Sequence, residues 1–229
     1  MRPEETAAIA LDAVSVERGG RRILRGVSLT IGSGTTAVIG ANGSGKSTFA
    51  RLLNGLVQPS SGHVRVLGLD PSRDARALRG RVGFVFTDPQ AQILMPTPAE
   101  DIALSLRGLP RTEIRGRVAA FLEGYGLTAQ ADTPAFELSG GQKQLLALAS
   151  VLATAPDLLI ADEPTTLLDL RNAHRIADLL LAQSMPRVIV THDLELAGRC
   201  DRAVLFADGE VITAGAPNAV LDAYRTVAA

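Results

Sequence analysis

The sequence predicts an α/β fold with a parallel-sheet core, an antiparallel β subdomain and an inserted helical subdomain. Apolar and polar residues alternate within residues 9–31, which predicts short antiparallel strands. Brief apolar runs at Thr35–Ile39, Val82–Phe86 and Leu158–Ala161 are typical of buried parallel strands. From about Ala99 to Gly126 the apolar residues instead recur at helical spacing. A helical block inserted into alternating strands and helices gives this architecture.

The remaining elements complete the predicted domain. Further helices are expected at Phe49–Leu56, from Gly140 to just before Pro156, and around Ile176–Leu180; a strand is expected at Val188–Val190 and a hairpin turn at Asp208-Gly209. We therefore expect one domain over residues 1–229. Its core and β subdomain would comprise about 1–92 and 146–229, and its helical subdomain about 93–145.

Composition excludes several classes of protein. The chain has 229 residues, 46% hydrophobic and 21% charged, so it can bury a core and is not disordered. A net charge of −1 without a basic stripe predicts no nucleic-acid partner. The single Cys200 excludes an internal disulfide framework and a cysteine-based zinc site. No run of residues is long and apolar enough to cross a bilayer, so a membrane role would require a partner.

A phosphate-binding motif follows the first buried strand. The residues Gly40, Ala41, Asn42, Gly43, Ser44, Gly45, Lys46 and Ser47, followed by Thr48, match the pattern G-x-x-x-x-G-K-[ST] in full. Backbone N–H groups of such a loop point at phosphate oxygens, Lys46 supplies positive charge, and Ser47 can place its hydroxyl on Mg²⁺. A chance glycine turn would not explain the preceding strand and following helix. The fold is thus predicted to be a P-loop NTPase (RecA-like) core that binds ATP.

Two carboxylates end another buried strand. Asp162 and Glu163 follow Leu158–Ala161 and would lie at the carboxyl edge of the sheet, where ligands bind. Asp162 is the expected partner of Mg²⁺, and Glu163 is placed to polarise the attacking water. By themselves two acids after an apolar run are equally typical of a helix cap. The phosphate motif favours the catalytic interpretation.

A third motif reveals a family resemblance. The residues Leu138, Ser139, Gly140, Gly141 and Gln142 reproduce the signature of the ATP-binding-cassette ATPases, which this chain resembles over essentially its whole length. In that family the signature of one chain closes over the ATP held by a second chain. The resemblance implies a dimer as the working unit, and a homodimer is favoured because both motifs are present here.

The resemblance assigns further residues. Asp169, in Thr165–Asp169, stands at the acidic position of the family's dimer-contact loop. His192, in Thr191-His192-Asp193, stands at the switch position, where it would contact the γ-phosphate and support catalysis with Glu163 and Lys46. A histidine after a strand is otherwise usually structural.

Two positions depart from the family pattern. Arg18 stands where the family usually has an aromatic residue that stacks on adenine. A guanidinium can also lie over a purine, although a solvated surface arginine is an equal alternative. Thr87 stands where a glutamine usually ligates Mg²⁺ and links the site to the membrane partner. Thr87 offers a hydroxyl of shorter reach, so we expect altered or water-mediated coordination there.

The segment Phe86–Leu94 indicates the kind of cassette. Asp88-Pro89 followed by Gln92-Ile93-Leu94 is similar to the energy-coupling-factor (ECF) ATPases, which power vitamin and transition-metal uptake, and within them the biotin importer is favoured. This implies two membrane partners, a transmembrane coupling (T) protein and a substrate-binding (S) protein, and a peripheral place on the cytoplasmic face of the cell (inner) membrane. Residues near Thr87–Leu94 would line the groove that receives the T protein.

Three alternatives remain open. A soluble cassette ATPase acting on nucleic acid or ribosomes commonly has two cassettes or a long insert, whereas this chain has one cassette and a short insert. A small-molecule P-loop kinase would have no use for Leu138–Gln142. A regulator that binds but does not hydrolyse ATP would have no use for Glu163.

Overall fold

The computed structural model describes residues 7–228 and contains two β-sheets. The larger sheet has the strand order β5-β6-β7-β3-β8-β9, in which only β9 runs antiparallel to its neighbour. Its strands are β3 (Thr35–Ile39), β5 (Val82–Val85), β6 (Leu158–Asp162), β7 (Arg187–Val190), β8 (Arg202–Ala207) and β9 (Glu210–Gly215). Parallel pairing brings the carboxyl ends of β3, β6 and β7 to one edge.

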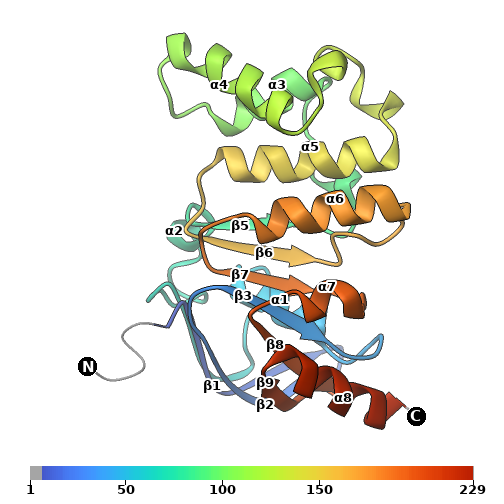
Figure 1. Ribbon diagram of the computed structural model, residues 1–229. Helices are drawn as coiled ribbons and strands as arrows, with labels where there is room; N and C mark the ends of the chain where they lie inside the picture. Colours follow the sequence, from blue (N-terminus) through green and yellow to red (C-terminus); the bar gives the residue numbers. More distant parts are fainter. Residues whose placement is uncertain (1–6, 229) are drawn as a thin grey trace.

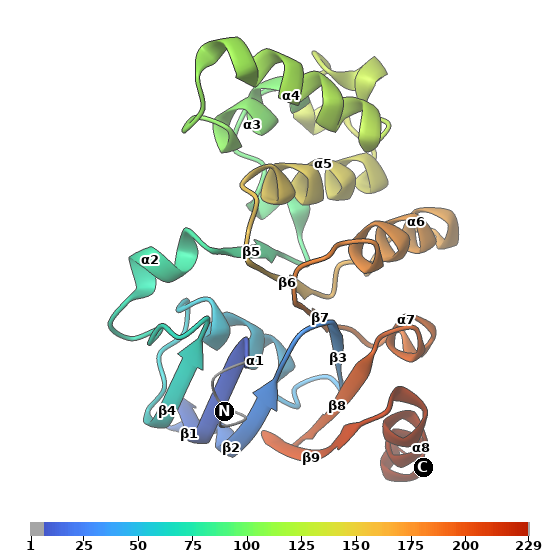
Figure 2. The same ribbon diagram turned by 60° about the vertical axis from the view of Figure 1, so that its left-hand side comes forward.

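The smaller sheet is antiparallel and has the order β2-β1-β4. It comprises β1 (Ile9–Arg18), β2 (Arg21–Ile31) and β4 (Ser61–Val66). Gly19 and Gly20 both have positive φ angles, as a tight hairpin turn between twisted strands requires. The two sheets touch where Arg25 N donates to Gly209 O at 2.9 Å, and Figure 2 shows β2 beside β9.

Eight α-helices complete the described chain. They are α1 (Lys46–Leu53), α2 (Ala75–Arg79), α3 (Pro98–Ser105), α4 (Arg111–Gly124), α5 (Gly140–Ala153), α6 (Leu170–Leu181), α7 (Leu194–Gly198) and α8 (Pro217–Ala228). Figure 1 shows α3 and α4 at the top of the molecule, with α5 between them and the sheet. Within residues 7–228, no helix is long and apolar enough to span a bilayer.

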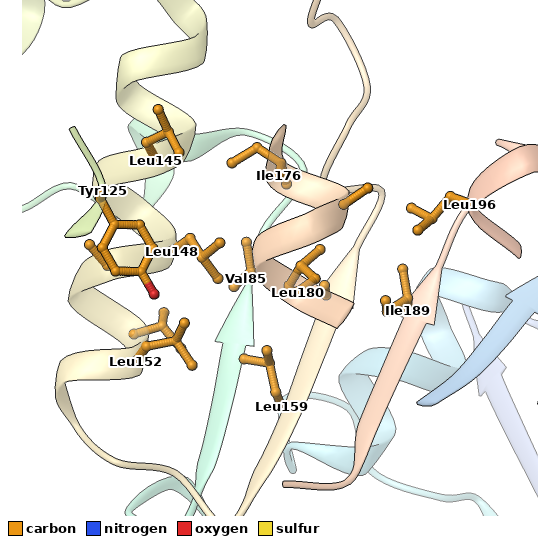
Figure 3. Packing of buried hydrophobic residues seen from close by; sticks show 14 of the residues in the cluster. Val85, Tyr125, Leu145, Leu148, Leu152, Leu159, Ile176, Leu180, Ile189 and Leu196 are labelled. Atoms are coloured by element: carbon orange, nitrogen blue, oxygen red, sulfur yellow. The ribbon is translucent and has the colours of Figure 1, made fainter. Parts of the chain in front are cut away.

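The core is divided by the larger sheet into two hydrophobic clusters. Alternate residues of a strand point to opposite faces, so Leu159 and Ala161 of β6 join one cluster while Leu158 and Ile160 join the other. The first cluster packs under α3 to α8, and the second packs against α1 and the smaller sheet. Figure 3 shows Leu148 and Leu152 of α5 facing the strands. Both faces of the sheet are therefore covered, as a parallel sheet requires.

The only cysteine lies in the first cluster. Cys200 is buried, and its Sγ lies 3.4 Å from Leu196 O. Burial raises the pKa of its thiol to about 12, with Asp201 adding to the shift. The thiol therefore acts as a small apolar group in the core.

The predicted fold class is confirmed, but some elements differ in detail. The helix predicted over Phe49–Leu56 ends at Leu53, because Asn54 caps it and Gly55 turns to a φ of 67°. The helical stretch predicted at 99–126 is two helices, since Pro110 begins α4. No pattern predicted β4, α2, α7 or α8; β4 is only half covered, and α2 and α7 have five residues each.

A buried carboxylate joins α3 to α5. Asp101 is 4% exposed, and its Oδ2 accepts a hydrogen bond from Ser150 Oγ of α5 at 2.6 Å. Its Oδ1 accepts from the backbone N–H groups of Leu94 and Met95 at 2.8 and 3.1 Å. This one side chain fixes the segment before α3 to the helix that follows the signature motif.

Replacing Asp101 by alanine should lower the free energy of unfolding by about 2–4 kcal/mol, because the buried Ser150 hydroxyl and two partly buried backbone N–H groups lose their acceptor. Urea unfolding followed by circular dichroism measures the change. Glu123→Ala, in an exposed position of α4, is the matched control and should stay within about 0.5 kcal/mol of the wild type. Equal stability of the two variants would contradict the role given to Asp101.

Candidate functional site

The loop between β3 and α1 has the shape of a phosphate cradle. Gly40 has a φ of 146°, and a Cβ there would lie 2.1 Å from Phe206 O. Gly45, with a φ of 102°, has Leu24 Cδ2 only 2.8 Å from the place of a Cβ. Both positions therefore require glycine. The loop leads directly into the N-terminus of α1, whose first turn carries no acidic residue.

Lys46 lies buried within this loop. Its Nζ donates to the carbonyl oxygens of Gly40 and Ala41 at 2.8 and 2.9 Å. Burial lowers the pKa of Lys46, while the carboxylates of Glu163 and Asp162 partly oppose that shift. The buried hydroxyl of Ser44 has no hydrogen-bond partner. A cation held only by carbonyls and a free hydroxyl fit a phosphate group, which would give both a partner.

Hard oxygen atoms gather beside the loop. Ser47 Oγ donates to Asp162 Oδ1 at 2.9 Å, and Thr87 Oγ1 donates to the backbone oxygen of Asp162 at 2.8 Å. Asp162 is 1% exposed, and burial raises its pKa although Ser47 and Arg51 partly oppose this. Hydroxyl and carboxylate oxygens of this kind suit Mg²⁺. The residues present therefore fit that ion.

Glu163 and His192 form a close pair at the same edge. His192 Nδ1 lies 2.6 Å from Glu163 Oε2, and the same oxygen accepts from the His192 backbone N–H at 3.3 Å and from Thr166 Oγ1 at 3.2 Å. Glu163 also adopts a φ of 52°, which is uncommon for a residue with a side chain. Strained backbone of this kind occurs at sites where a side chain must be held in one place.

A cavity of about 480 Å³ adjoins α1, the helix that follows the loop. Arg18 and Thr48 line it together with Ile23, Arg51 and Val57. The structure thus places Arg18 on the same hollow as the helix that follows the phosphate loop. A hollow with two arginines and several aliphatic side chains can accept a flat base.

The signature residues begin α5. Ser139 Oγ accepts from the Gln142 backbone N–H at 3.3 Å, and Gln142 Oε1 accepts from the Ser139 N–H at 2.8 Å, forming a capping box. Gly140 and Gly141 form the first turn of the helix. The helix start therefore presents N–H groups on an exposed turn.

The acidic loop lies at the start of α6. Asp169 caps that helix, with its Oδ1 accepting from the Asn172 N–H at 2.9 Å. Leu167, two residues earlier, is 96% exposed and has a φ of 66°. A large apolar side chain held outward by an uncommon backbone conformation is a candidate contact for another chain.

The predicted residues thus form two separate groups. Lys46, Ser47, Asp162, Glu163 and His192 meet at the carboxyl edge of the larger sheet, with Thr87 beside them. Across residues 7–228, no hydrogen bond or ion pair joins this group to Ser139–Gln142. Figure 1 shows β6 and β7 between α5 and α1. The two groups of predicted residues therefore lie apart within one chain.

One residue near the site escaped sequence reasoning. Arg51 Nη2 lies 4.0 Å from Asp162 Oδ2, and its position four residues after Ser47 on one helix could have suggested this. Gln92 lies near Thr87 in sequence but serves the backbone instead. Its Nε2 donates to Phe84 O at 3.1 Å, and its Oε1 accepts from Phe86 N at 3.2 Å.

A groove of about 380 Å³ lies between residues 93–96 and residues 135–136. It is lined by Gln90, Ile93, Leu94, Met95, Pro96, Ala135, Phe136 and Lys143. Leu94 is 74% and Phe136 79% exposed, so the groove presents apolar side chains to solvent. Of the segment Thr87–Leu94, the residues Gln90, Ile93 and Leu94 line this groove, whereas Thr87 lies at the Asp162 site. That the groove receives a partner stays a prediction.

Comparisons with known proteins agree with these motifs. Residues 24–166 match the ABC transporter family. The chain is 42% identical over 223 residues to the biotin transport ATP-binding protein BioM of Rhizobium etli, covering 96% of this chain and 99% of BioM. It is 38% identical to the energy-coupling factor transporter ATP-binding protein EcfA1 of Lacticaseibacillus paracasei, covering 87% of this chain and 75% of EcfA1.

Solved structures give the same result. The structure of CbiO1 from Clostridium perfringens, described as part of the ABC transporter complex CbiONQ, superposes with a TM-score of 0.85. The identity is 32%, covering 97% of this chain and 93% of CbiO1. Two relatives above 30% identity over most of their lengths leave no other assignment. The chain belongs to the ABC transporter family, as an ATP-binding subunit that hydrolyses ATP to power transport.

Proposed function

We propose that this chain powers an importer of the energy-coupling-factor type, and that two copies form its working unit. The observation that carries the proposal is that the phosphate loop and Ser139–Gln142 lie apart in one chain. An apolar groove next to the signature helix adds a place for a membrane partner. The names of EcfA1 and CbiO1 support the importer class.

The dimer follows from the two half-sites. The phosphate loop of one copy would hold the triphosphate, and Ser139–Gln142 of the other would close over the γ-phosphate with helix N–H groups. Asp169 and the exposed Leu167 would lie in the contact between copies. Because both halves are complete in this sequence, a homodimer is favoured over a pair of different chains.

The chemistry is mainly positioning and stabilisation of charge. Lys46 would exchange its carbonyl partners for β- and γ-phosphate oxygens, and Arg18 would lie over the base. Ser47 and Asp162 would hold Mg²⁺, with Thr87 beside them, and that ion would neutralise phosphate charge when bound. Glu163 would accept a proton from the attacking water. His192 lies against Glu163 and would hold the carboxylate and the γ-phosphate in place.

The groove is the proposed docking place of the membrane-embedded coupling (T) protein. It lies at the edge of the proposed helical subdomain, about residues 93–145, and its rim is joined to the signature helix. Lys143, one residue after Gln142, donates to Phe136 O at 3.1 Å. Movement of a segment in the groove would thereby reach the start of α5. The chain would then lie at the cytoplasmic face of the membrane, held by the T protein.

Biotin is the favoured cargo of the proposed importer, and a transition-metal ion is the alternative. The name of BioM, at 42% identity, supports biotin. A separate membrane substrate-binding (S) protein would select the cargo. A soluble ABC-type ATPase acting on nucleic acid or ribosomes is the alternative function, and it predicts co-purification with RNA rather than with membrane proteins.

Glu163→Gln should keep ATP binding but lower turnover by ~10² or more, because the amide cannot accept the proton of water. The variant should also accumulate ATP-bound dimers, which size-exclusion chromatography with multi-angle light scattering detects. Glu123→Gln, a surface change on α4, should match the wild type in both measurements. Normal phosphate release by Glu163→Gln would refute the base assignment, and an ATP-loaded variant that stays monomeric would refute the dimer.

Asp162→Asn should stabilise the nucleotide-free chain near neutral pH by a few degrees in melting temperature. Burial raises the pKa of Asp162, so the folded chain favours the neutral carboxyl and loses that contribution to stability as pH rises through the raised pKa. The gain should therefore shrink as pH falls. Adding Mg²⁺ and ATP should reverse the ranking, because the wild type alone retains the charge that holds the ion.

Thermal unfolding between acidic and neutral pH, with and without Mg²⁺-ATP, measures both effects. Asp132→Asn, an exposed site, is the control and should change neither the pH dependence nor the response to Mg²⁺. A difference between Asp162→Asn and the wild type that stays constant with pH would contradict the assigned burial effect.

Leu94→Arg should prevent assembly with the membrane partners while leaving ATP binding intact, because the arginine introduces charge into the apolar groove. The wild-type chain is purified with its membrane subunits and reconstituted in proteoliposomes. These proteoliposomes should take up labelled biotin when ATP is supplied. Ile212→Arg, an equally drastic change on the half-exposed side chain of β9, is the matched control. Recovery of RNA instead of integral membrane proteins would favour the alternative function.

A further inference from the structure

We propose that Asn172 is a positioning residue that joins the acidic loop to the signature turn within one chain, and that Gly141 is glycine in order to admit it. Asn172 lies in the first turn of α6, three residues after Asp169. The signature turn lies at the start of α5. The inference rests on the proposed function, in which both segments act on a nucleotide held by the partner copy.

A side chain on Gly141 would overlap the side-chain amide of Asn172. A Cβ on Gly141 would lie 2.6 Å from Asn172 Cγ, 2.6 Å from its Nδ2 and 2.8 Å from its Oδ1. All three are atoms of the side-chain amide, so turning the amide about its own bond does not relieve the overlap. The side chain would have to leave this position altogether.

The backbone gives no reason of its own for glycine here. Gly141 is an ordinary helical residue without a positive φ, and alanine is the better helix former at such a position. Gly140, its exposed neighbour in the same turn, has no heavy atom of the described chain within 4 Å of the place that a Cβ would take, whereas Gly141 is buried against Asn172. The three atoms nearest to the place of a Cβ on Gly141 all belong to Asn172, and we assign the lack of a side chain there to this contact.

Asn172 is itself held in place from the other side. Its Nδ2 donates to Asp169 Oδ2 at 2.6 Å, while its backbone N–H donates to Asp169 Oδ1 at 2.9 Å. These bonds hold the pKa of the Asp169 carboxyl below its usual range, which keeps it an acceptor. The chain of contacts therefore runs from Asp169 through the amide of Asn172 to Gly141.

This connection has a mechanical consequence. If Asp169 shifts when two copies meet, the amide of Asn172 must follow its acceptor, and the turn at Gly141 is packed against that amide. The acidic loop and the signature turn would then approach a partner's nucleotide as one unit. Asn172 need not touch the nucleotide to affect the rate of hydrolysis.

A double-mutant cycle at Gly141 and Asn172 tests the inference. Gly141→Ala should lower ATP turnover by about a hundredfold or less, and Asn172→Ala by about threefold, because the first forces an overlap and the second only removes a link. Combining them should restore turnover at least about tenfold relative to Gly141→Ala, since the overlapping amide is gone. Gly140→Ala is the matched control, and adding Asn172→Ala to it should restore nothing.

Two results would overturn the inference. In one, the double variant is as slow as Gly141→Ala, which would mean that only the partner's nucleotide requires glycine at that position. In the other, adding Asn172→Ala restores the turnover of Gly140→Ala as well as it restores that of Gly141→Ala. Thermal unfolding of the nucleotide-free chain provides a second test, because Gly141→Ala should lower the melting temperature and Asn172→Ala should reverse that loss.

This design separates the inference from the proposed function. The melting temperatures report the contact in a single chain, whether or not two copies meet. Suppose that Gly141→Ala lowers the melting temperature, that Asn172→Ala reverses the loss, and that wild-type turnover does not depend on dimer formation. The contact then stands and the proposed function fails. If turnover depends on dimers but Asn172→Ala rescues neither the turnover nor the melting temperature of Gly141→Ala, the contact between Asn172 and Gly141 has no role.

Discussion

The whole site depends on a buried carboxylate at the end of a parallel strand. Asp162 ends β6, in register with Val190 of β7, which in turn pairs with Val38 just before the phosphate loop. This pairing brings residues over a hundred positions apart into hydrogen-bonding distance, as between Ser47 and Asp162. Covering both faces of the sheet with apolar side chains keeps Asp162 dry, and a dry carboxylate favours a cation. The fold thus creates a place where the positive charge of a bound cation would be favoured.

The remaining parts of the site lie on different elements of the chain. The phosphate loop belongs to the sheet, whereas Ser139–Gln142 belong to a helix packed on its far side. Asp101 and Lys143 fix the groove segments to that helix, so the groove, the signature turn and α5 share a connected framework. Loops fixed to a helix at several points can only move with it. Such a framework is suited to passing a displacement between a membrane partner and the nucleotide.

Sequence patterns predicted the parts of this structure that depend on local rules. Gly40–Ser47 and Asp162-Glu163 were found because glycine spacing and buried runs have direct conformational consequences. Contacts between segments distant in sequence were not found: nothing in the order of residues indicates that Ser150 donates to Asp101, or that Gly141 lies against Asn172. β4 was missed because Gly62 and two exposed neighbours interrupt its alternation. Gln92 is a further example, because its side chain bonds to the backbone of Phe84 and Phe86, which its place in the sequence does not indicate.

The buried cysteine makes the chain convenient for spectroscopy. Thiol-reactive dyes and spin labels attack the thiolate, and Cys200 is both covered by the core and kept protonated at neutral pH. Cysteines introduced on the surface could therefore be labelled selectively without first removing the native one. A single labelled site on the outer face of α4 would then report, by distance measurement between two copies, how far the subunits travel in each turnover.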